Sequence, residues 1–437
     1  MYREKTEQLL AFIENSPSSF HAVYNMKQEL LENGFEELRE SRTWELCAGG
    51  KYFVTRNDSS LIAFKIPSAE FAGFHIMASH SDSPCFKIKE NAEMEVDKKY
   101  VKLNVERYGG MLCAPWFDRP LSVAGRVMVK DGNRIRTKLV DVDRDLLMIP
   151  NLAVHMNREA NDGYKYNAQV DMLPLFGDET AKGAFGKIVA EAAGVEEAAV
   201  ISKDLFLYNR EKSSIWGANE EFVSARRLDD LQCAFCSLQG LLHAKETETA
   251  VPVHCVLDNE EVGSGTKQGA ASTFLKDVLH RINSAMGRTE EQYLTALASS
   301  FMVSADNAHA VHPNHGDKTD PTNRPYINGG IVIKHSANQK YTTDAVSAAV
   351  MKMICEKAGV PVQTFVNRSD MAGGSTLGNI SNTQVALNTV DIGLAQLAMH
   401  SPYETAGVKD TAYLIKMAET FFGSELHITE DGDYELR

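Results

Sequence analysis

The feature that most constrains the fold is an alternation of short apolar runs with longer amphipathic patterns. The apolar runs are of strand length and partly β-branched; they cover residues 61–66, 74–78, 251–257 and 301–305. Helical patterns lie at residues 231–242 and 341–358, and apolar spacings of three and four predict two more helices within the first 31 residues. Strands that alternate with helices are typical of a doubly wound, mostly parallel sheet. The sequence therefore predicts the α/β class.

A different pattern occupies the middle of the chain. Alternating apolar positions flank Asp131-Gly132, a dipeptide that is typical of a hairpin turn. The alanine-rich segment 181–199 predicts a helix in the same region. A chain of 437 residues is long enough for two domains or three. We therefore expect a β-rich domain at residues 91–213, inserted into a catalytic domain that residues 1–90 and 214–437 form together.

Composition excludes several classes of partner. The chain has 45 basic and 59 acidic residues, and its net charge of −14 repels phosphate backbones and anionic lipid. We therefore expect no nucleic acid and no membrane as partner, and no window reaches the roughly 18 apolar residues of a membrane span. Seven cysteines without regular spacing do not indicate a disulfide framework. Because charged residues interrupt the first helical pattern, where a signal peptide is apolar, we expect a cytoplasmic protein.

Histidines and acids recur where the predicted strands end. They are His80 and Asp82 after the run at 74–78, Glu260 and Glu261 after the run at 251–257, Asp306 after the run at 301–305, and His400 at the end of the apolar stretch 390–399. Asp229 and Asp230 directly precede the helical pattern at 231–242. Open α/β sheets place their sites at the carboxyl ends of strands, so these positions favour a functional site.

Each group also has a simpler interpretation when it is taken alone. A single histidine is more often structural, and pairs of acids are typical of the first turn of a helix. Two histidines with three carboxylates, however, suit a dinuclear site for zinc, manganese or cobalt, in which a carboxylate bridges metals roughly 3.5 to 4 Å apart. Cys233 and Cys236 lie inside a helical pattern with no second pair, and we expect them to be buried thiols.

Seven short motifs follow one another along the chain. They are Ser16-Pro17-Ser18-Ser19-Phe20-His21-Ala22-Val23, His80-Ser81-Asp82-Ser83-Pro84, Ile149-Pro150-Asn151-Leu152-Ala153-Val154-His155, Arg227-Leu228-Asp229, Asp258-Asn259-Glu260-Glu261-Val262-Gly263-Ser264, Ser304-Ala305-Asp306 and Met399-His400-Ser401. In this order they resemble the M18 aspartyl aminopeptidases over nearly the whole chain. Cys113-Ala114-Pro115 stands where eukaryotic members commonly have Trp-His-Thr, so the resemblance is to a bacterial-type branch.

The resemblance implies a zinc-exopeptidase-like fold that binds two divalent metal ions, zinc first, with manganese or cobalt as alternatives. Asp229 would bridge the two ions. The other ligands would be His80 and Asp306 for one ion, and Glu261 and His400 for the other. Among the remaining acids, Glu260 would act as the general base, and Asp82 would orient a histidine ligand by a hydrogen bond.

The resemblance also implies an assembly. The inserted domain would pair subunits, and the family builds closed tetrahedral dodecamers. His155 matches the histidine that reaches across the subunit interface in the family, where an imidazole could hydrogen-bond the oxyanion of the intermediate. Alternatively, His155 holds the interface itself.

The substrate expected from the resemblance is a peptide with an acidic first residue. Lys334 matches the position at which the family places a cation for the acidic side chain, although an ordinary solvated lysine is the alternative. Tyr341 and His309 are expected to contact the substrate as well. Two rival functions are a broad-specificity aminopeptidase or amidohydrolase on the same fold, and a non-catalytic, metal-stabilised shell protein. The spare acid Glu260 counts against the second rival, because a structural metal site needs no base.

Overall fold

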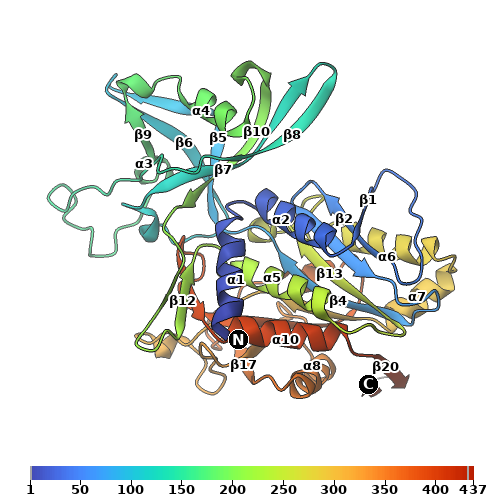
Figure 1. The fold of residues 1–437 in the computed structure, drawn as a ribbon. Coiled ribbons are helices and arrows are strands. Elements are labelled where there is room, and N and C mark those ends of the chain that lie inside the picture. Colours follow the sequence, from blue (N-terminus) through green and yellow to red (C-terminus); the bar gives the residue numbers. More distant parts are fainter. Residues whose placement is uncertain (1, 431–432) are drawn as a thin grey trace.

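The structure is a computed structural model that describes residues 2–430 and 433–437. Within these residues, a ten-stranded sheet forms the core of the larger part, and a six-stranded sheet forms the smaller part (Figure 1). The strands of the larger sheet are β1 (Glu36–Leu38), β2 (Lys51–Arg56), β3 (Ser60–Lys65), β4 (Gly73–His80), β13 (Ala250–Leu257), β14 (Phe301–Ala305), β15 (Ala308–His309), β16 (Ile331–His335), β17 (Val362–Val366) and β18 (Asn388–Gln396).

The centre of the larger sheet is parallel. Strands β13, β4, β14 and β18 are neighbours in that order and all run in the same direction. Their apolar runs are buried throughout, because helices cover both faces of the sheet. One face packs against α1 (Tyr2–Glu14), α2 (Ser19–Glu32), α5 (Leu228–His243), α8 (Ala345–Ala358) and α10 (Asp410–Phe422). The other face packs against α6 (Phe274–Ala285), α7 (Glu290–Ala298) and α9 (Leu377–Ser381), so the predicted α/β class is confirmed.

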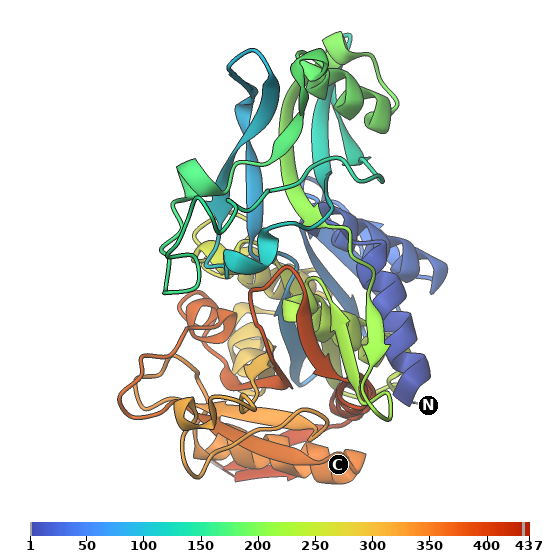
Figure 2. The ribbon, with the colours of Figure 1, turned by 90° about the vertical axis from the view of Figure 1, so that its left-hand side faces the viewer.

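The smaller sheet is antiparallel and stands above the larger part in Figure 2. Its strands are β5 (Cys85–Val96), β6 (Tyr100–Tyr108), β7 (Leu121–Asp131), β8 (Arg134–Asp141), β9 (Leu175–Asp178) and β10 (Val200–Asn209). The predicted hairpin is the β7–β8 turn, in which Gly132 has a φ of 60°. The domain boundaries near residues 90 and 213 stay a prediction.

Two predicted helices are shorter than the sequence patterns suggested. In place of a helix over 181–199, α4 covers only Phe185–Ala193, because Gly194 ends it in the left-handed conformation. The pattern at 341–358 becomes helical only at Ala345, where Asp344 caps α8. The four residues before α8, which include Tyr341, therefore lie outside the helix.

Smaller elements lie outside these two sheets. They include β11 (Ser214–Trp216), β12 (Phe222–Ala225) and β19 (Glu404–Gly407) in a three-stranded sheet, β20 (Leu426–Glu430) and β21 (Asp433–Leu436) in a two-stranded antiparallel sheet, and the one-turn helix α3 (Ala168–Asp171). Strand β12 lies directly before α5 and pairs with β19, which follows the loop that carries His400. This pairing brings two distant parts of the sequence to the end of the central strands. None of the helices in the described part of the chain has the length and apolar character to cross a membrane.

Candidate metal centre

Three of the predicted ligands lie at the carboxyl ends of neighbouring parallel strands. His80 is the last residue of β4, and Asp306 directly follows β14. Glu261 lies in η4 (Glu260–Val262), a short 3-10 helix just after β13. Because β13, β4 and β14 are adjacent and parallel, these side chains meet at one edge of the sheet.

The other two predicted ligands come from irregular backbone. Asp229 lies in the first turn of α5, but its φ of −84° and ψ of 106° are not helical, and its carboxylate lies beside two histidines. His400 lies between β18 and β19 with a φ of 68°.

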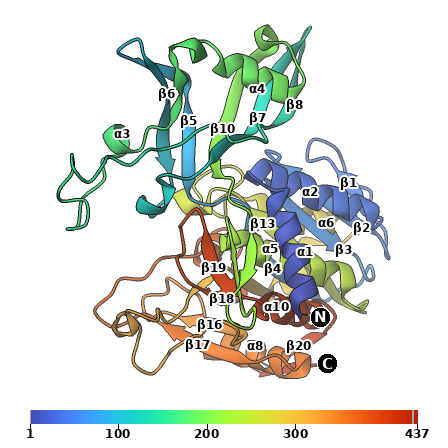
Figure 3. The same ribbon diagram turned by 60° about the vertical axis from the view of Figure 1, so that its left-hand side comes forward.

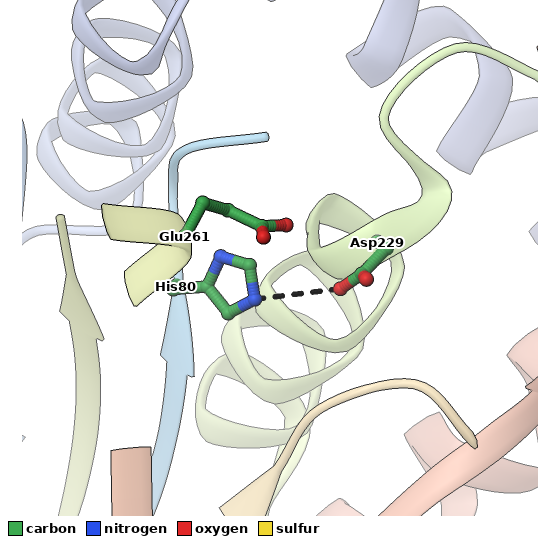
Figure 4. Close-up of side chains that lie close together, drawn as sticks. All are labelled: His80, Asp229 and Glu261. Atoms are coloured by element: carbon green, nitrogen blue, oxygen red, sulfur yellow. Dashed lines mark ion pairs between the residues drawn. The ribbon is translucent and has the colours of Figure 1, made fainter. Parts of the chain in front are cut away.

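The Asp229 carboxylate lies between two pairs of side chains. Its Oδ1 is 3.4 Å from His80 Nε2, and the same nitrogen is 4.0 Å from Asp306 Oδ1 (Figure 4 shows His80, Asp229 and Glu261). Its Oδ2 is 3.4 Å from His400 Nε2, which is also 3.4 Å from Glu261 Oε2. The structure therefore brings all five predicted ligands together, with one oxygen of Asp229 facing each pair.

The donor set has the properties of a metal site. Asp229 Oδ1 and Glu261 Oε1 are buried without a hydrogen-bond partner among the described residues, a costly state for a carboxylate oxygen unless a cation contacts it. Ligand atoms of His80, Asp229 and Glu261 all lie within 4.8 Å of one another. Carboxylate and imidazole ligands without thiolates suit a divalent zinc, manganese or cobalt ion. The residues present therefore fit the metal.

Burial and charge shift the titration of these groups. Burial raises the pKa of Glu261 well above its usual value, and the charge of Asp229 adds to the shift. Burial would also raise the pKa of Asp229, but its contacts with His400 and His80 outweigh burial and lower that pKa. The effect of the Asp229 charge on Glu261 shows that the two carboxylates are close enough to repel each other, and a bound cation would relieve this repulsion.

Glu260 directly precedes Glu261, and both acids line a pocket of about 180 Å³ together with Asp229, Asp306 and His400. Burial raises the pKa of Glu260 to about 8, close to the range in which a carboxylate can both accept and return a proton. The role of Glu260 as general base stays a prediction.

The Asp82 carboxylate contacts His80 and the backbone of Glu260 and Glu261. Its Oδ1 lies 3.3 Å from His80 Nδ1, and the carbonyl oxygen of the same residue, Asp82, lies 3.1 Å from that nitrogen. The same carboxylate accepts the backbone N–H groups of Glu260 and Glu261 at 3.1 Å and the Tyr108 hydroxyl at 2.7 Å. Asp82 therefore links β4 to the turn after β13, a connection that the sequence did not reveal.

The expected substrate-binding residues line the same pocket. Lys334, Tyr341 and His309 are all part of its wall. Lys334 is only 2% exposed, so the solvated-lysine interpretation is wrong. Its Nζ donates to the Asp306 carbonyl oxygen at 2.7 Å and lies 3.7 Å from Asp306 Oδ2. The cation is thus held against a predicted metal ligand.

His155 does not share this environment. It is exposed in the irregular segment between β8 and α3, which projects outward beside α3 in Figure 3. The pocket lining, as far as the described residues form it, does not include His155. Cys233 and Cys236 are buried free thiols inside α5, as expected.

Two acids with structural contacts to the cluster were not predicted. Asp230 Oδ2 accepts the backbone N–H of His80 at 3.1 Å, and Glu404 accepts those of Asp229 and His400. Neither has a spacing that identifies its role, because the backbone N–H groups that donate to them leave no pattern in the sequence. The nearest signal is that Asp230 follows Asp229 directly.

Comparison with known proteins identifies the family. The model of the family described as "Aminopeptidase I zinc metalloprotease (M18)" matches residues 12–422. The chain belongs to the M18 family. It is therefore a metallo-aminopeptidase. A relative named "Probable M18 family aminopeptidase 2" from Clostridium acetobutylicum is 50% identical over 96% of this chain and 98% of its own, and the protein of the same name from Ectopseudomonas mendocina is 41% identical over 97% and 99%.

Solved structures of M18 enzymes share the whole fold. A chain in the structure titled "Cryo-EM structure of the Ape4 and Nbr1 complex" superposes with a TM-score of 0.93 at 36% identity, covering 97% of this chain and 86% of that one. The mApe1 dodecamer of S. cerevisiae has a TM-score of 0.85 at 29% identity, covering 96% and 97%. The resemblance to the M18 family, with bacterial relatives, is confirmed.

Proposed function

We propose that this M18 enzyme holds two divalent metal ions, zinc first, and removes acidic residues from the amino terminus of peptides. The observation that carries the proposal is the position of Asp229, whose Oδ1 faces His80 and Asp306 while its Oδ2 faces His400 and Glu261. A carboxylate with one oxygen directed to each pair is suited to bridge two ions. The two buried oxygens without hydrogen-bond partners support the same assignment.

We assign a separate chemical role to each of the acids around the proposed metal centre. Bound divalent ions supply Lewis acidity toward the scissile carbonyl and toward water. Glu260, which lines the pocket, accepts the proton of the attacking water and later delivers it to the leaving amine. Asp82 keeps His80 and the backbone of Glu260 in place for these steps. The free amino terminus of the substrate would bind among the carboxylates, which explains removal of single terminal residues.

Metal removal and replacement test the function directly. We expect the chelator-treated enzyme to lose activity and to regain it when zinc, manganese or cobalt is added back separately. Each reconstituted enzyme is assayed on peptides that begin with Asp, Glu or Leu. Metal content measured on the same samples should approach two ions per subunit. Full activity after complete metal removal would contradict the proposal, whereas equal rates on all three peptides would contradict only the acidic preference.

The acidic preference is assigned to Lys334. A protein with a net charge of −14 repels acidic peptides at long range, so it needs a local cation to select them. Lys334 lies in the pocket wall with its Nζ 5.1 Å from the centre of the Tyr341 ring. A broad-specificity aminopeptidase is the second candidate, and one observation favours it: Lys334 already donates to the Asp306 carbonyl oxygen.

Lys334→Met separates these two candidates. Loss of a hydrogen bond to a charged substrate group costs about 1.5 to 3 kcal/mol, so kcat/KM for Asp-terminal peptides should fall about 10- to 100-fold further than for Leu-terminal peptides. The ratio of the two values is the measurement, because the variant also disturbs Asp306 for every substrate. An equal loss on both peptides would remove Lys334 from the specificity pocket.

We also propose self-association through the smaller sheet, with a tetrahedral dodecamer as the closed form. The relative solved as a dodecamer and the exposed apolar side chains around the projecting segment support it, among them Leu152, Val154 and Met156. Because His155 is exposed in this segment, we propose that it completes the site of a neighbouring subunit. The cytoplasmic location stays a prediction.

Mixing two inactive variants tests the shared site. Removing one oxyanion donor typically costs about 2.7 to 4 kcal/mol, so His155→Ala should be about 100- to 1,000-fold slower than the wild type. When His155→Ala and Glu260→Gln subunits are dissociated and reassembled together, part of the activity should return. No recovery in mixed oligomers verified by mass would show that His155 serves its own subunit or only the interface.

A further inference from the structure

Glu404, the first residue of β19, is a buried acid that makes two backbone contacts. Its side chain is 2% exposed. Its Oε2 accepts the backbone N–H of Asp229 at 3.0 Å, and its Oε1 accepts the backbone N–H of His400 at 2.7 Å. One carboxylate therefore joins the peptide groups of two proposed metal ligands that lie on different segments.

These two ligands lack the support that regular structure gives. Asp229 has non-helical dihedral angles at the start of α5, and His400 has a φ of 68°, a conformation that costs energy for a residue with a Cβ atom. Glu404 accepts the backbone N–H groups of both residues, at 3.0 and 2.7 Å, so one side chain fixes the two peptide groups relative to each other.

The side chains of the same two residues meet in the cluster, where His400 Nε2 lies 3.4 Å from Asp229 Oδ2. We propose that Glu404 is a positioning residue that holds Asp229 and His400 in the geometry that binds metal. The inference rests on the proposed metal centre, and Glu404 itself is not a ligand in it. A residue that orients metal ligands typically changes metal affinity by about 10- to 100-fold when it is replaced.

Asp410 provides a matched control. It is also completely buried, and its carboxylate also accepts two backbone N–H groups, those of Asn328 at 2.6 Å and of Gly330 at 3.0 Å. Neither of these residues is a proposed metal ligand. Asp410→Asn therefore removes the same kind of interaction as Glu404→Gln, with the same change of charge, but leaves the cluster intact.

The experiment measures zinc affinity in the full-length chain. Wild type, Glu404→Gln and Asp410→Asn are stripped of metal, their Tm values are recorded, and zinc Kd is measured by competition with a chelator of known affinity. We expect Glu404→Gln to bind zinc about 10- to 100-fold more weakly than the wild type, with kcat recovering at saturating zinc. Asp410→Asn should lower the Tm and leave the zinc Kd unchanged.

The outcomes are distinguishable. Equal zinc Kd values for Glu404→Gln and the wild type, or equal weakening in both variants, would overturn the positioning role. A wild type that binds no zinc would instead overturn the proposed metal centre. Glu404→Asp, which keeps the charge but shortens the side chain, serves if the glutamine variant does not fold, and it too should bind zinc more weakly than Asp410→Asn does.

Discussion

Replacing Asp229 by alanine is expected to remove both metal binding and activity. Its two oxygens face two different pairs of side chains, so the loss affects both proposed ions at once. Metal ions supply several kcal/mol of transition-state stabilisation, and activity should fall by about 1,000-fold or more. Metal content by elemental analysis and kcat/KM on Asp-terminal peptides, measured on one preparation, check the prediction.

The control for this variant is Asp229→Asn. It keeps the size of the side chain but removes the negative charge, so we expect weaker metal binding than in the wild type and a folded protein. If Asp229→Ala retained two ions per subunit and near-normal turnover, Asp229 would not be the bridging ligand. The contacts of Asp229 with His80 and His400 would then be only structural.

Replacing Glu260 by glutamine should also abolish most of the activity, but, unlike Asp229→Ala, it should leave the metal content unchanged. Both acids of the Glu260–Glu261 pair line the pocket, but it is Glu261 whose Oε2 lies 3.4 Å from His400 Nε2. Glutamine has the same size but cannot accept the proton, and loss of a general base typically lowers kcat by about 10² to 10⁴-fold. Metal analysis and steady-state kinetics on the same sample decide the outcome.

Glu261→Gln is the matched comparison, since it makes the same chemical change one residue away. Its carboxylate is directed toward His400 Nε2, so this variant should lose metal as well as activity. Turnover near the wild-type value in Glu260→Gln would remove Glu260 from the role of base. The same metal loss in both variants would mean that the two acids act alike.

The fold could be predicted where side-chain pattern decides it. The run at residues 251–257 is apolar and partly β-branched, and it forms the fully buried strand β13. The helix expected over 181–199 was too long, because composition favours a helix there while a single glycine, Gly194, ends it. Local backbone preferences therefore set boundaries that hydrophobic pattern alone does not show.

The candidate site could be predicted only in part for a similar reason. Acids and histidines at strand ends are visible in the sequence, and all five predicted ligands do converge. The burial of Lys334 against the Asp306 carbonyl oxygen was not visible, because its partner is a backbone atom. Glu404 was missed for the same reason: its partners are peptide N–H groups.

The order of the proposed ligands along the chain bears on biosynthesis. The first is His80 and the last is His400, in a polypeptide of 437 residues. A ribosome has to translate through codon 400 before the last proposed ligand can join the others, even if the early strands have already formed. A product of premature termination before codon 400 therefore lacks a complete centre.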